Sequence, residues 1–453
     1  MSELPKGWVG VPLNKIVDKI VGGGTPSKSV PSYYQGNIPW MTVKDMNKLY
    51  LTDTVDHITQ EAVENSSTNI IPAGTPIIAT RMSLGKIVRA SFESAINQDL
   101  KALFVNRELN DYYFEYWYRS QGMKIQSLGT GTTVKGVRLE VINALEFPLA
   151  PLAEQKRIVA KLDEVLAQVD TIKARLDRIP AILKRFRQSV LAAAVSGKLT
   201  EEWRGVNAVS SPIKKSLGEV ITNIGQGWSP KCENIPAEEN TWGVIKTSAV
   251  QNISFFDYEN KALPHSLEPR YEYEILVGDI LTTRAGPRVR CGVTAFVESS
   301  RSKLMICDKV YRYRVKESEG ISKFLVYLMN SPQYLSEIEE MKTGISDSGM
   351  NLTQAKFKQL SLFWPHIEEQ KEIVRLVDQY FAFADSIEAQ VKKAQARVDN
   401  LTQSILAKAF RGELVAQDPN DEPADKLLER IAKARTEAEQ LAKAAKKAVK
   451  SQR

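Results

Sequence analysis

Residues that hold metals, form disulfides or cross membranes are scarce in this 453-residue sequence. The three cysteines, Cys232, Cys291 and Cys307, all lie in the second half, and none forms a Cys-x-x-Cys pair. Neither a disulfide framework nor a zinc knuckle is therefore expected, and three histidines make a metal site improbable. No apolar stretch is long enough to span a bilayer, and the first residues lack a signal-peptide pattern. These absences predict a soluble cytoplasmic protein that binds no metal.

Motifs for catalysis are also missing. No Gly-x-x-x-x-Gly-Lys-Ser/Thr occurs, because Ser83-Leu84-Gly85-Lys86 is only a fragment of it. No Gly-x-Gly-x-x-Gly opens a strand-helix-strand unit, and Gly22-Gly23-Gly24 precedes Thr25-Pro26, which indicates a turn. No cluster of acidic residues and lysine of the nuclease type stands out. The sequence therefore predicts a protein without catalytic activity of its own.

Positive charge is present, but it is spread unevenly. The net charge is +7, and a basic isoelectric point hints at nucleic acid. Residues 1–150 and residues 213–365 each carry a net charge of only +1. Any phosphate-binding surface in these two segments must therefore be a local patch.

One long helix is present twice, 215 residues apart. Glu154-Gln155-Lys156-Arg157-Ile158-Val159 returns as Glu369-Gln370-Lys371-Glu372-Ile373-Val374. Apolar residues follow in alternating steps of four and three, which is the 3.5-residue period of a coiled coil. These positions are Ile158, Leu162, Val165, Val169, Ile172, Leu176, Ile179, Leu183, Phe186 and Val190, and then Ile373, Val377, Tyr380, Ala384, Ile387, Val391, Ala394, Val398, Leu401 and Ile405. The repeat predicts a pseudo-twofold protein with two equivalent halves.

Proline interrupts the first copy of the helix. Pro180 stands where the second copy has Gln395. Proline removes one hydrogen bond within a helix and clashes with the preceding turn. We expect a kink, or a helix broken in two, near Arg178-Ile179, with the packing continuing beyond it.

The repeat divides the chain into head, helix, head, helix and tail. We assign head 1 to residues 1–150, a central spacer helix to 151–212, head 2 to 213–365, a second spacer helix to 366–420 and a basic helical tail to 421–453. Both heads contain short β-branched segments between Gly, Pro and Asn, which indicate strands and turns. Residues Tyr112 to Ser120 and Ile321 to Asn330 are rich in aromatics and Leu and are expected to be helical. Each head is thus predicted to be a mixed α/β domain, present in two copies.

Basic and hydroxyl side chains recur in the predicted loops of both heads. Arginine can grip guanine edges with two hydrogen bonds, and both arginine and lysine neutralise phosphate. The candidate DNA contacts in head 1 are Lys28, Lys44, Arg81, Lys86, Arg89, Thr132 and Lys135, and those in head 2 are Lys231, Lys246, Arg284, Arg288, Arg290 and Ser346. By sequence, Lys28 matches Lys231, Lys44 matches Lys246, and the strand before Arg81 matches the strand before Arg284. A basic surface loop without a ligand is the alternative for any one of them.

Two further pairs coincide between the heads. Trp40 and Trp242 are expected to pack in the cores rather than to stack on bases. Gln98-Asp99 and Cys307-Asp308 are expected to supply buried capping carboxylates.

The tail is rich in Ala, Lys and Glu and is expected to be helical. Its last eleven residues contain Lys443, Lys446, Lys447, Lys450 and Arg453 and no acidic residue. We expect a solvated, frayed helix here, and contact with DNA phosphates or an acidic partner is the alternative.

Two variable heads, each followed by a Pro-Leu-Ala-Glu-Gln-Lys-Arg-Ile-Val type of segment, resemble the specificity subunits of type I restriction-modification systems. The matching segments here begin at Pro151 and Pro365, and the helix ends Ser196-Gly197-Lys198-Leu199 and Arg411-Gly412-Glu413-Leu414 match as well. The second copy departs slightly, because it has His366 and a different spacing before Glu369-Gln370. The resemblance covers essentially residues 1–420.

The resemblance implies two target-recognition domains, each reading one part of a split, asymmetric DNA site. It implies that the two long helices pack antiparallel and act as a ruler. It also implies partners, namely two DNA adenine methyltransferase subunits with S-adenosylmethionine and restriction subunits that use ATP and Mg. None of these cofactors is expected to bind this chain itself.

Two other classes of function remain open at this stage. A scaffold whose heads bind proteins is compatible with nearly neutral heads, and DNA binding that is absent or insensitive to salt would support it. A self-contained enzyme is opposed by the missing motifs.

Overall fold

The computed structural model describes residues 4–132 and 134–451, with the side chains of residues 442, 443 and 445–451 left out of the description. The chain forms two compact units. Unit 1 consists of Met1–Leu176 and Ala394–Arg453, and unit 2 consists of Asp177–Lys393. Each unit therefore combines one head with the adjoining parts of both long helices.

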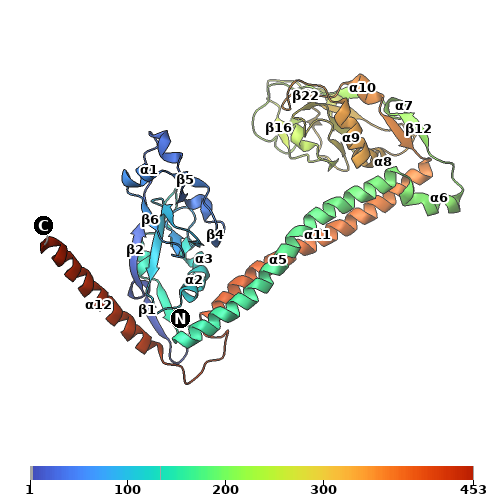
Figure 1. Cartoon of the computed structure of the whole chain (residues 1–453). Coiled ribbons are helices and arrows are strands. Elements are labelled where there is room, and N and C mark those ends of the chain that lie inside the picture. The colour runs from blue at the N-terminus through green and yellow to red at the C-terminus, as the bar shows by residue number, and fades with distance from the viewer. Residues whose placement is uncertain (1–3, 133, 452–453) are drawn as a thin grey trace. The chain divides into compact units, whose positions relative to one another are not determined.

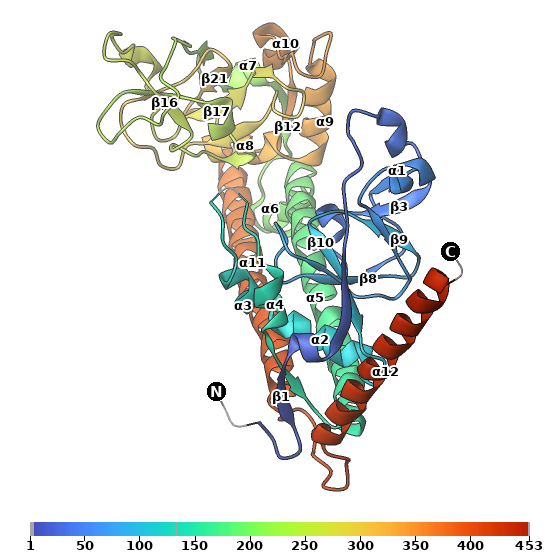
Figure 2. The ribbon, with the colours of Figure 1, turned by 90° about the vertical axis from the view of Figure 1, so that its left-hand side faces the viewer.

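The two long helices are α5 (Leu152–Val195) and α11 (Ile367–Ala409). They lie side by side and run in opposite directions (Figures 1 and 2). Lys173 bonds Asp399 at 2.8 Å in unit 1, and Arg187 bonds Asp385 at 2.5 Å in unit 2, so residue numbers rise along one helix as they fall along the other. The antiparallel pair predicted from the family resemblance is confirmed.

The heptad positions of the two long helices are buried to different degrees. Ile158 and Leu162 in unit 1, like Ile373 and Val377 in unit 2, are fully buried against their heads. Ile172, Tyr380 and Leu401 keep 45%, 39% and 47% of their surface exposed. Leu183, Ala384 and Val391 are buried although they belong to neither head core, so the paired helices also bury part of the seam between themselves.

Helix α5 continues without interruption through Pro180. The expected break into two helices is therefore wrong. Proline deprives the carbonyl of Leu176 of its usual donor, but packing against α11 on both sides of this point, such as the contact between Phe186 and Tyr380, maintains the helix.

Head 1 is built from two sheets that meet at a small core. The larger sheet has the order β2 (Val17–Gly22), β10 (Leu100–Val105), β7 (Ile77–Ala79), β8 (Ile87–Ala90) and β4 (Tyr50–Leu51). The smaller sheet has the order β5 (Asp56–Ile58), β3 (Ile38–Met41), β9 (Ser94–Ile96) and β6 (Asn69–Ile71). A separate pair, β1 (Val9–Pro12) with β11 (Glu146–Leu149), leads into α5. The helices are α1 (Gln60–Glu64), α2 (Asp111–Ser120), α3 (Gly122–Ser127) and α4 (Leu139–Asn143).

Head 2 repeats this plan with a smaller second sheet. Its larger sheet has the order β13 (Gly225–Gln226), β21 (Val310–Tyr313), β17 (Ile280–Thr283), β19 (Thr294–Phe296) and β15 (Ile253–Ser254). The second sheet has the order β16 (Asn260–Ala262), β14 (Gly243–Ile245) and β20 (Leu304–Met305). Two strand pairs complete it, β12 (Ile213–Ser216) with β23 (Ser361–Trp364) and β18 (Ala285–Gly286) with β22 (Met350–Asn351). The helices are α7 (Leu217–Val220), α8 (Ser322–Met329), α9 (Pro332–Met341) and α10 (Gln354–Lys358). The predicted mixed α/β class is confirmed for both heads.

The aromatic segments predicted to be helical are α2 and α8. Tyr113, Phe114, Trp117 and Tyr118 of α2 are buried, as is every residue from Phe324 to Met329 in α8. These helices pack between the sheets and the long helices, and they share one core with each.

The tail forms α12 (Ala424–Ser451), which begins as part of unit 1 (Figures 1 and 2). Leu427 and Ile431 are buried in the core of head 1. Arg435 donates hydrogen bonds to the carbonyls of Asn14 and Val17, at 2.8 and 3.1 Å. The first half of the tail therefore packs against head 1, whereas the expectation of a solvated, frayed helix concerns the last eleven residues. The side chains of Lys443, Lys446, Lys447 and Lys450, and Arg453 as a whole, lie outside the described residues.

Candidate nucleic-acid interface

Each head is fixed to its long helix by a buried glutamine of the repeated Glu-Gln motif. In unit 1 the side chain of Gln155 donates to the carbonyl of Ala150 at 2.8 Å and accepts from the amide of Asn110 at 3.1 Å. In unit 2 the side chain of Gln370 donates to the carbonyl of Pro365 at 3.0 Å and accepts from the amide of Ile321 at 3.0 Å. Asn110 and Ile321 precede the first residues of α2 and α8. The motif is thus structural, because it holds the head helix against the long helix.

A second repeated contact joins the same helices. The hydroxyl of Tyr116 on α2 donates to Asp163 of α5, and the hydroxyl of Tyr327 on α8 donates to Asp378 of α11. Burial and the neighbouring carboxylate raise the pKa of both phenols, so both remain donors at neutral pH. Both heads are therefore mounted on their helices in the same way.

Three candidate residues of head 1 lie around one hollow of about 580 Å³ or at its edge. Lys28 and Lys44 line it, together with Tyr34 and Gln98. Lys44 bonds Asp56 at 2.8 Å, which raises the pKa of its ammonium group. Arg81 lies at the edge, 3.5 Å from Asp99, whose side chain also lines the hollow.

The floor of the hollow is part of the core. Trp40 is buried, and its indole donates to the carbonyl of Gly24 at 3.3 Å. The carboxylate of Asp99 is 11% exposed and accepts from the side chain of Asn97 at 3.3 Å. Trp40 lies in the core as expected, whereas among the described residues the nearly buried carboxylate of Asp99 is bonded by side chains rather than by backbone amides.

The loop that contains Thr132 and Lys135 runs beside Arg81. The amide of Met82 donates to the carbonyl of Lys135 at 3.0 Å, and Arg81 pairs with Gly136 as an isolated β-bridge. Thr132 and Lys135 are exposed. The structure therefore places this loop next to Arg81, a proximity that the sequence did not predict.

The other two candidates of head 1 lie elsewhere. Lys86 is exposed on a different hollow, where it donates to Asn47 at 2.9 Å. Arg89 is only 7% exposed and bonds Glu115 at 2.6 Å. The position of Arg89 excludes it from a DNA-binding surface, because its guanidinium is used inside the head. Arg89 stands within the apolar strand Ile87–Ala90, and this charge inside an apolar run was a signal of burial in the sequence.

The candidate arginines of head 2 are occupied by protein groups. Arg284 donates to the carbonyl of Asp308 at 2.8 Å and to Asn351 at 3.0 Å. Arg288 bonds Glu339 at 2.6 Å and Asp347 at 2.7 Å, and these two carboxylates raise its pKa. The positive charge of Arg288 is therefore neutralised locally, which argues against Arg288 as a phosphate contact.

Arg290 closes a loop rather than facing solvent. Its guanidinium donates to the carbonyls of Thr247 and Val250, the latter at 2.5 Å. Burial lowers its pKa. Ser346 is exposed in the loop that follows α9, and its hydroxyl lies 3.0 Å from that of Ser348. Lys231 is exposed, whereas Lys246 lies 3.7 Å from Glu259.

The basic residues that match by sequence do not occupy equivalent backbone positions. The amide of Thr80 donates to the carbonyl of Asp99, and its carbonyl accepts from Val137. In head 2 the same two bonds are made by Arg284, with Lys309 and Leu352. Arg284 is thus the counterpart of Thr80, so the counterpart of Arg81 is Ala285.

The lysine pairs are displaced in the same way. Thr42 precedes the short helix Val43–Asp45 and Lys246 precedes the short helix Thr247–Ala249, so Lys246 corresponds to Thr42 rather than to Lys44. Thr25 bonds Gln98 as Ser229 bonds Asp308, which makes Lys28 the counterpart of Cys232. The sequence-based matching of these lysines is therefore wrong by two and by one residue.

Lys309 is a residue that the sequence comparison missed. It occupies the position of Asp99 in head 1 and is exposed. Matching the two aspartates, Asp99 and Asp308, concealed this lysine, because the hydrogen-bond register pairs Gln98 with Asp308 instead.

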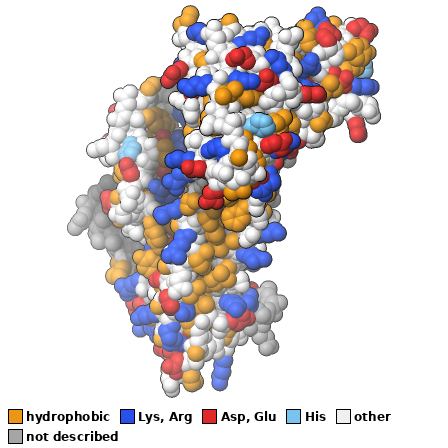
Figure 3. All heavy atoms as spheres, turned by 90° about the vertical axis from the view of Figure 1, so that its right-hand side faces the viewer, with side chains coloured by type: hydrophobic (Ala, Val, Ile, Leu, Met, Phe, Trp, Pro, Cys, Tyr) orange, Lys and Arg blue, Asp and Glu red, His pale blue; other side chains and the backbone are white. Residues whose placement is uncertain are grey.

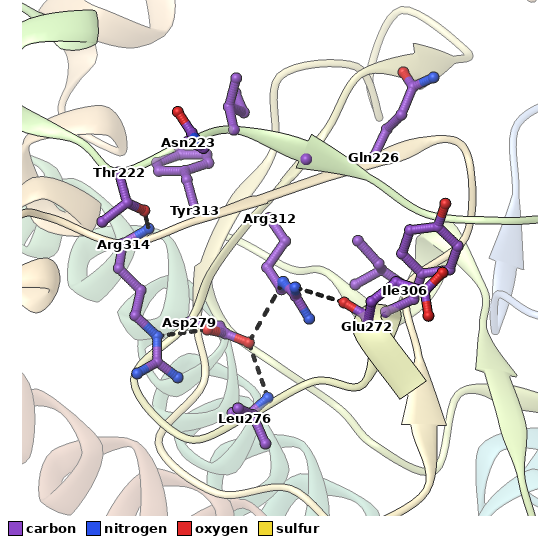
Figure 4. A pocket seen from close by; sticks show the side chains of 13 residues that line it. Thr222, Asn223, Gln226, Glu272, Leu276, Asp279, Ile306, Arg312, Tyr313 and Arg314 are labelled. Carbon is purple, nitrogen blue, oxygen red and sulfur yellow. Dashed lines mark hydrogen bonds and ion pairs between the residues drawn. The ribbon is translucent and has the colours of Figure 1, made fainter. Parts of the chain in front are cut away.

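Another hollow of head 2 is an internal ion-pair site (Figure 4). The buried carboxylate of Asp279 bonds Arg314 at 2.7 Å and accepts from the amide of Leu276 at 2.8 Å. Arg312 donates to the carbonyls of Glu272 and Glu274, the former at 2.8 Å. Since the charged groups of this hollow bond one another and the nearby backbone, we interpret it as a stabilising ion-pair network rather than a reactive site.

The described residues offer neither a metal site nor a membrane-spanning helix. They contain no group of three or more His, Cys, Asp and Glu side chains arranged to hold a metal ion. Within the same residues, no helix has the length and apolar character needed to cross a membrane.

Comparison with known proteins agrees with this architecture. The sequence profile of the type I restriction modification DNA specificity domain matches residues 5–181 and 214–395. The chain is 32% identical over 430 residues to the type I restriction enzyme StySPI specificity subunit of Salmonella potsdam, covering 92% of this chain and 91% of the relative. It is also 32% identical over 433 residues to the EcoKI specificity subunit of Escherichia coli K12, with 92% and 91% covered.

Solved structures share the fold. A chain from a structure of a type I restriction-modification system covers 91% of this chain and 100% of its own length, with a TM-score of 0.65 and 21% identity. The HsdS subunit from Thermoanaerobacter tengcongensis covers 91% and 98%, with a TM-score of 0.52 and 21% identity. This chain therefore belongs to the family of type I restriction-modification DNA specificity subunits.

Proposed function

We propose that this chain selects the DNA site for a type I restriction-modification complex and that each head reads one part of a split, asymmetric site. One observation carries this proposal. The two heads share a backbone frame, yet equivalent loop positions hold different side chains, such as Arg81 against Ala285 and Asp99 against Lys309. A common frame suits one class of ligand, duplex DNA, and different side chains suit different base sequences.

The DNA-facing surface of head 1 in this proposal is the edge of its hollow, with Lys28, Lys44, Arg81, Thr132 and Lys135. The exposed fractions of the Lys44 and Arg81 side chains, 60% and 53%, leave them accessible to a ligand. In head 2 the corresponding surface contains Lys231, Lys309 and Ser346, all of them exposed. A lysine that is not bonded to a carboxylate should bind phosphate most favourably, because no internal ion pair has to be broken first.

The partners follow from the same proposal. Two DNA adenine methyltransferase subunits with S-adenosylmethionine, and restriction subunits with ATP and Mg, would supply the chemistry. Hydrophobic side chains lie open on the paired helices, with Lys and Arg beside them (Figure 3). Ile172 and Leu401 of unit 1 and Ile182 and Phe383 of unit 2 are 45% to 59% exposed. Such a surface suits a docking subunit.

Exchange of one head tests the assignment. Residues 1–150 are replaced by the first head of another family member, and adenine methylation is mapped on a genome that carries the complex. We expect one half-site to change and the other to stay, since head 2 is untouched. A change in both half-sites, or in neither, contradicts the proposal. DNA binding that is absent or insensitive to salt would instead favour a protein-binding scaffold.

A second experiment addresses chemistry by the chain alone. Purified chain is incubated with DNA, S-adenosylmethionine, ATP and Mg. We expect neither methyl transfer nor hydrolysis, because the sequence contains no motif for either reaction. Turnover that persists after the partner subunits have been removed contradicts the assignment of catalysis to the partners.

A further inference from the structure

Arg81 differs from the other candidate arginines in what its guanidinium contacts. Arg89 and Arg290 donate to backbone carbonyls inside their heads, and Arg288 is bonded by two carboxylates. Arg284 donates to a carbonyl and to Asn351. Among the described residues Arg81 has one ion pair, at 3.5 Å, and 53% of its side chain is exposed. A guanidinium has five N–H donors, so most of those of Arg81 are available to a ligand.

The ion pair with Asp99 orients the exposed side chain of Arg81. Asp99 is almost buried, with 11% of its side chain exposed. Its Oδ2 accepts from Asn97 at 3.3 Å and from Gln98 at 3.4 Å, which leaves Oδ1 directed at Arg81. A carboxylate held in place beside an exposed arginine orients it and reduces the entropy that the arginine loses when it binds.

The aliphatic part of the Arg81 side chain packs against Gly136. A Cβ at this position would lie 3.4 Å from Cγ of Arg81, which is a tight contact. The stem therefore passes directly over the backbone of the loop that carries Thr132 and Lys135. Arginine, carboxylate and loop form one arrangement that presents the guanidinium outward.

We propose that Arg81 reads a guanine in the half-site bound by head 1, through paired hydrogen bonds to O6 and N7, and that Asp99 is its positioning residue. This inference rests on the proposed function. A planar fork of donors matches the two acceptors that guanine presents in the major groove, and the other bases lack this pair of acceptors. Head 2 has Ala285 at the same backbone position and cannot make this contact, so its half-site is read by other residues.

The test uses the complete complex with its methyltransferase subunits and maps methylation on a library of sites in which every position varies. Arg81→Ala is expected to lower the preference for guanine at one position of the first half-site by about 5- to 150-fold, as a lost bidentate contact does. Every other position, including the whole second half-site, keeps its preference. Asp99→Asn retains the packing and should weaken the same preference by a smaller factor.

Lys124→Ala is the matched control, because Lys124 is an exposed cation of α3 in the same head and is not among the candidate DNA contacts. It should leave all base preferences unchanged. If Arg81→Ala weakens methylation equally at all sites, Arg81 is a phosphate contact and the inference is overturned. Unchanged preferences at all positions overturn it as well. Arg81→Lys, which keeps the charge without the fork, decides the matter if the alanine variant fails to assemble, since base reading requires a loss of guanine preference there too.

Failure of the proposed function has a different signature. In that case the wild-type complex itself would methylate no defined split site, or exchange of head 1 would leave both half-sites unchanged. An intact split site with an unaltered first half-site in Arg81→Ala overturns only the guanine contact.

Discussion

Replacement of the repeated glutamines should loosen one head at a time. Glu-Gln occurs in both halves of this chain, and its glutamine attaches the head to the long helix. Among the described residues, Gln155 and Gln370 are fully buried and bond only backbone groups of their own unit. Gln155→Ala is therefore expected to destabilise unit 1, and Gln370→Ala to destabilise unit 2.

The magnitude follows from the groups left without partners. Gln155→Ala leaves the amide of Asn110 and the carbonyl of Ala150 unpaired, at about 1–3 kcal/mol for each buried group. The expected loss in the free energy of unfolding is thus about 2–6 kcal/mol. For units of this size, the midpoint changes by about 2–4 °C per kcal/mol, which places the shift between about 4 and 24 °C.

Hydrogen exchange followed by mass spectrometry resolves the two units. Gln155→Ala should accelerate exchange in α2 and leave α8 unchanged, whereas Gln370→Ala should do the reverse. Gln168→Ala is the control, because Gln168 is an exposed residue of α5, and surface substitutions usually change stability by less than about 0.5 kcal/mol. If each glutamine variant accelerates exchange equally in both helices, or in neither, the glutamines do not attach the heads separately and the reasoning fails.

Three further outcomes are expected. Pro180→Ala should raise the midpoint of thermal unfolding, followed by circular dichroism, by restoring an intrahelical hydrogen bond worth up to about 3 kcal/mol; a lower midpoint would show that the proline is favoured by its packing. Leu427→Ala and Ile431→Ala should each destabilise unit 1 by about 2–5 kcal/mol and speed hydrogen exchange in α12, and unaltered exchange would mean that the docking of α12 adds no stability. Arg187 bonds Glu388 across the helix pair and lowers the pKa of that carboxyl, so its contribution is present above the unfolded pKa of about 4.3 and disappears as the pH falls through the lowered folded value. Arg187→Met should accordingly be less stable than wild type at pH 7, by under about 1 kcal/mol in denaturant titrations, and equal to it in strong acid; a difference that widens in acid contradicts this assignment.

The sequence alone determined the features that depend on local pattern and on repetition. The 3.5-residue spacing predicted both long helices, because each turn buries the same face regardless of what lies farther along the chain. The abundance of aromatic residues and Leu around Tyr113 and Phe324 predicted the head helices. The repeated Glu-Gln motif identified two equivalent halves, although only the structure shows that Gln155 and Gln370 bond the heads.

Tertiary structure decided which basic residues are free to bind. Arg81 and Arg89 lie in one short stretch of sequence, yet the first faces solvent and the second is bonded by Glu115, a residue of another element. The strand register decided which positions of the two heads correspond, because loops of unequal length shift the sequence match by one or two residues while the hydrogen bonds fix the true pairing. The docking of α12 was likewise invisible in its composition, since the few apolar residues at its start become significant only against the exposed edge of head 1. Contacts between distant segments set all three outcomes, and no local pattern records them.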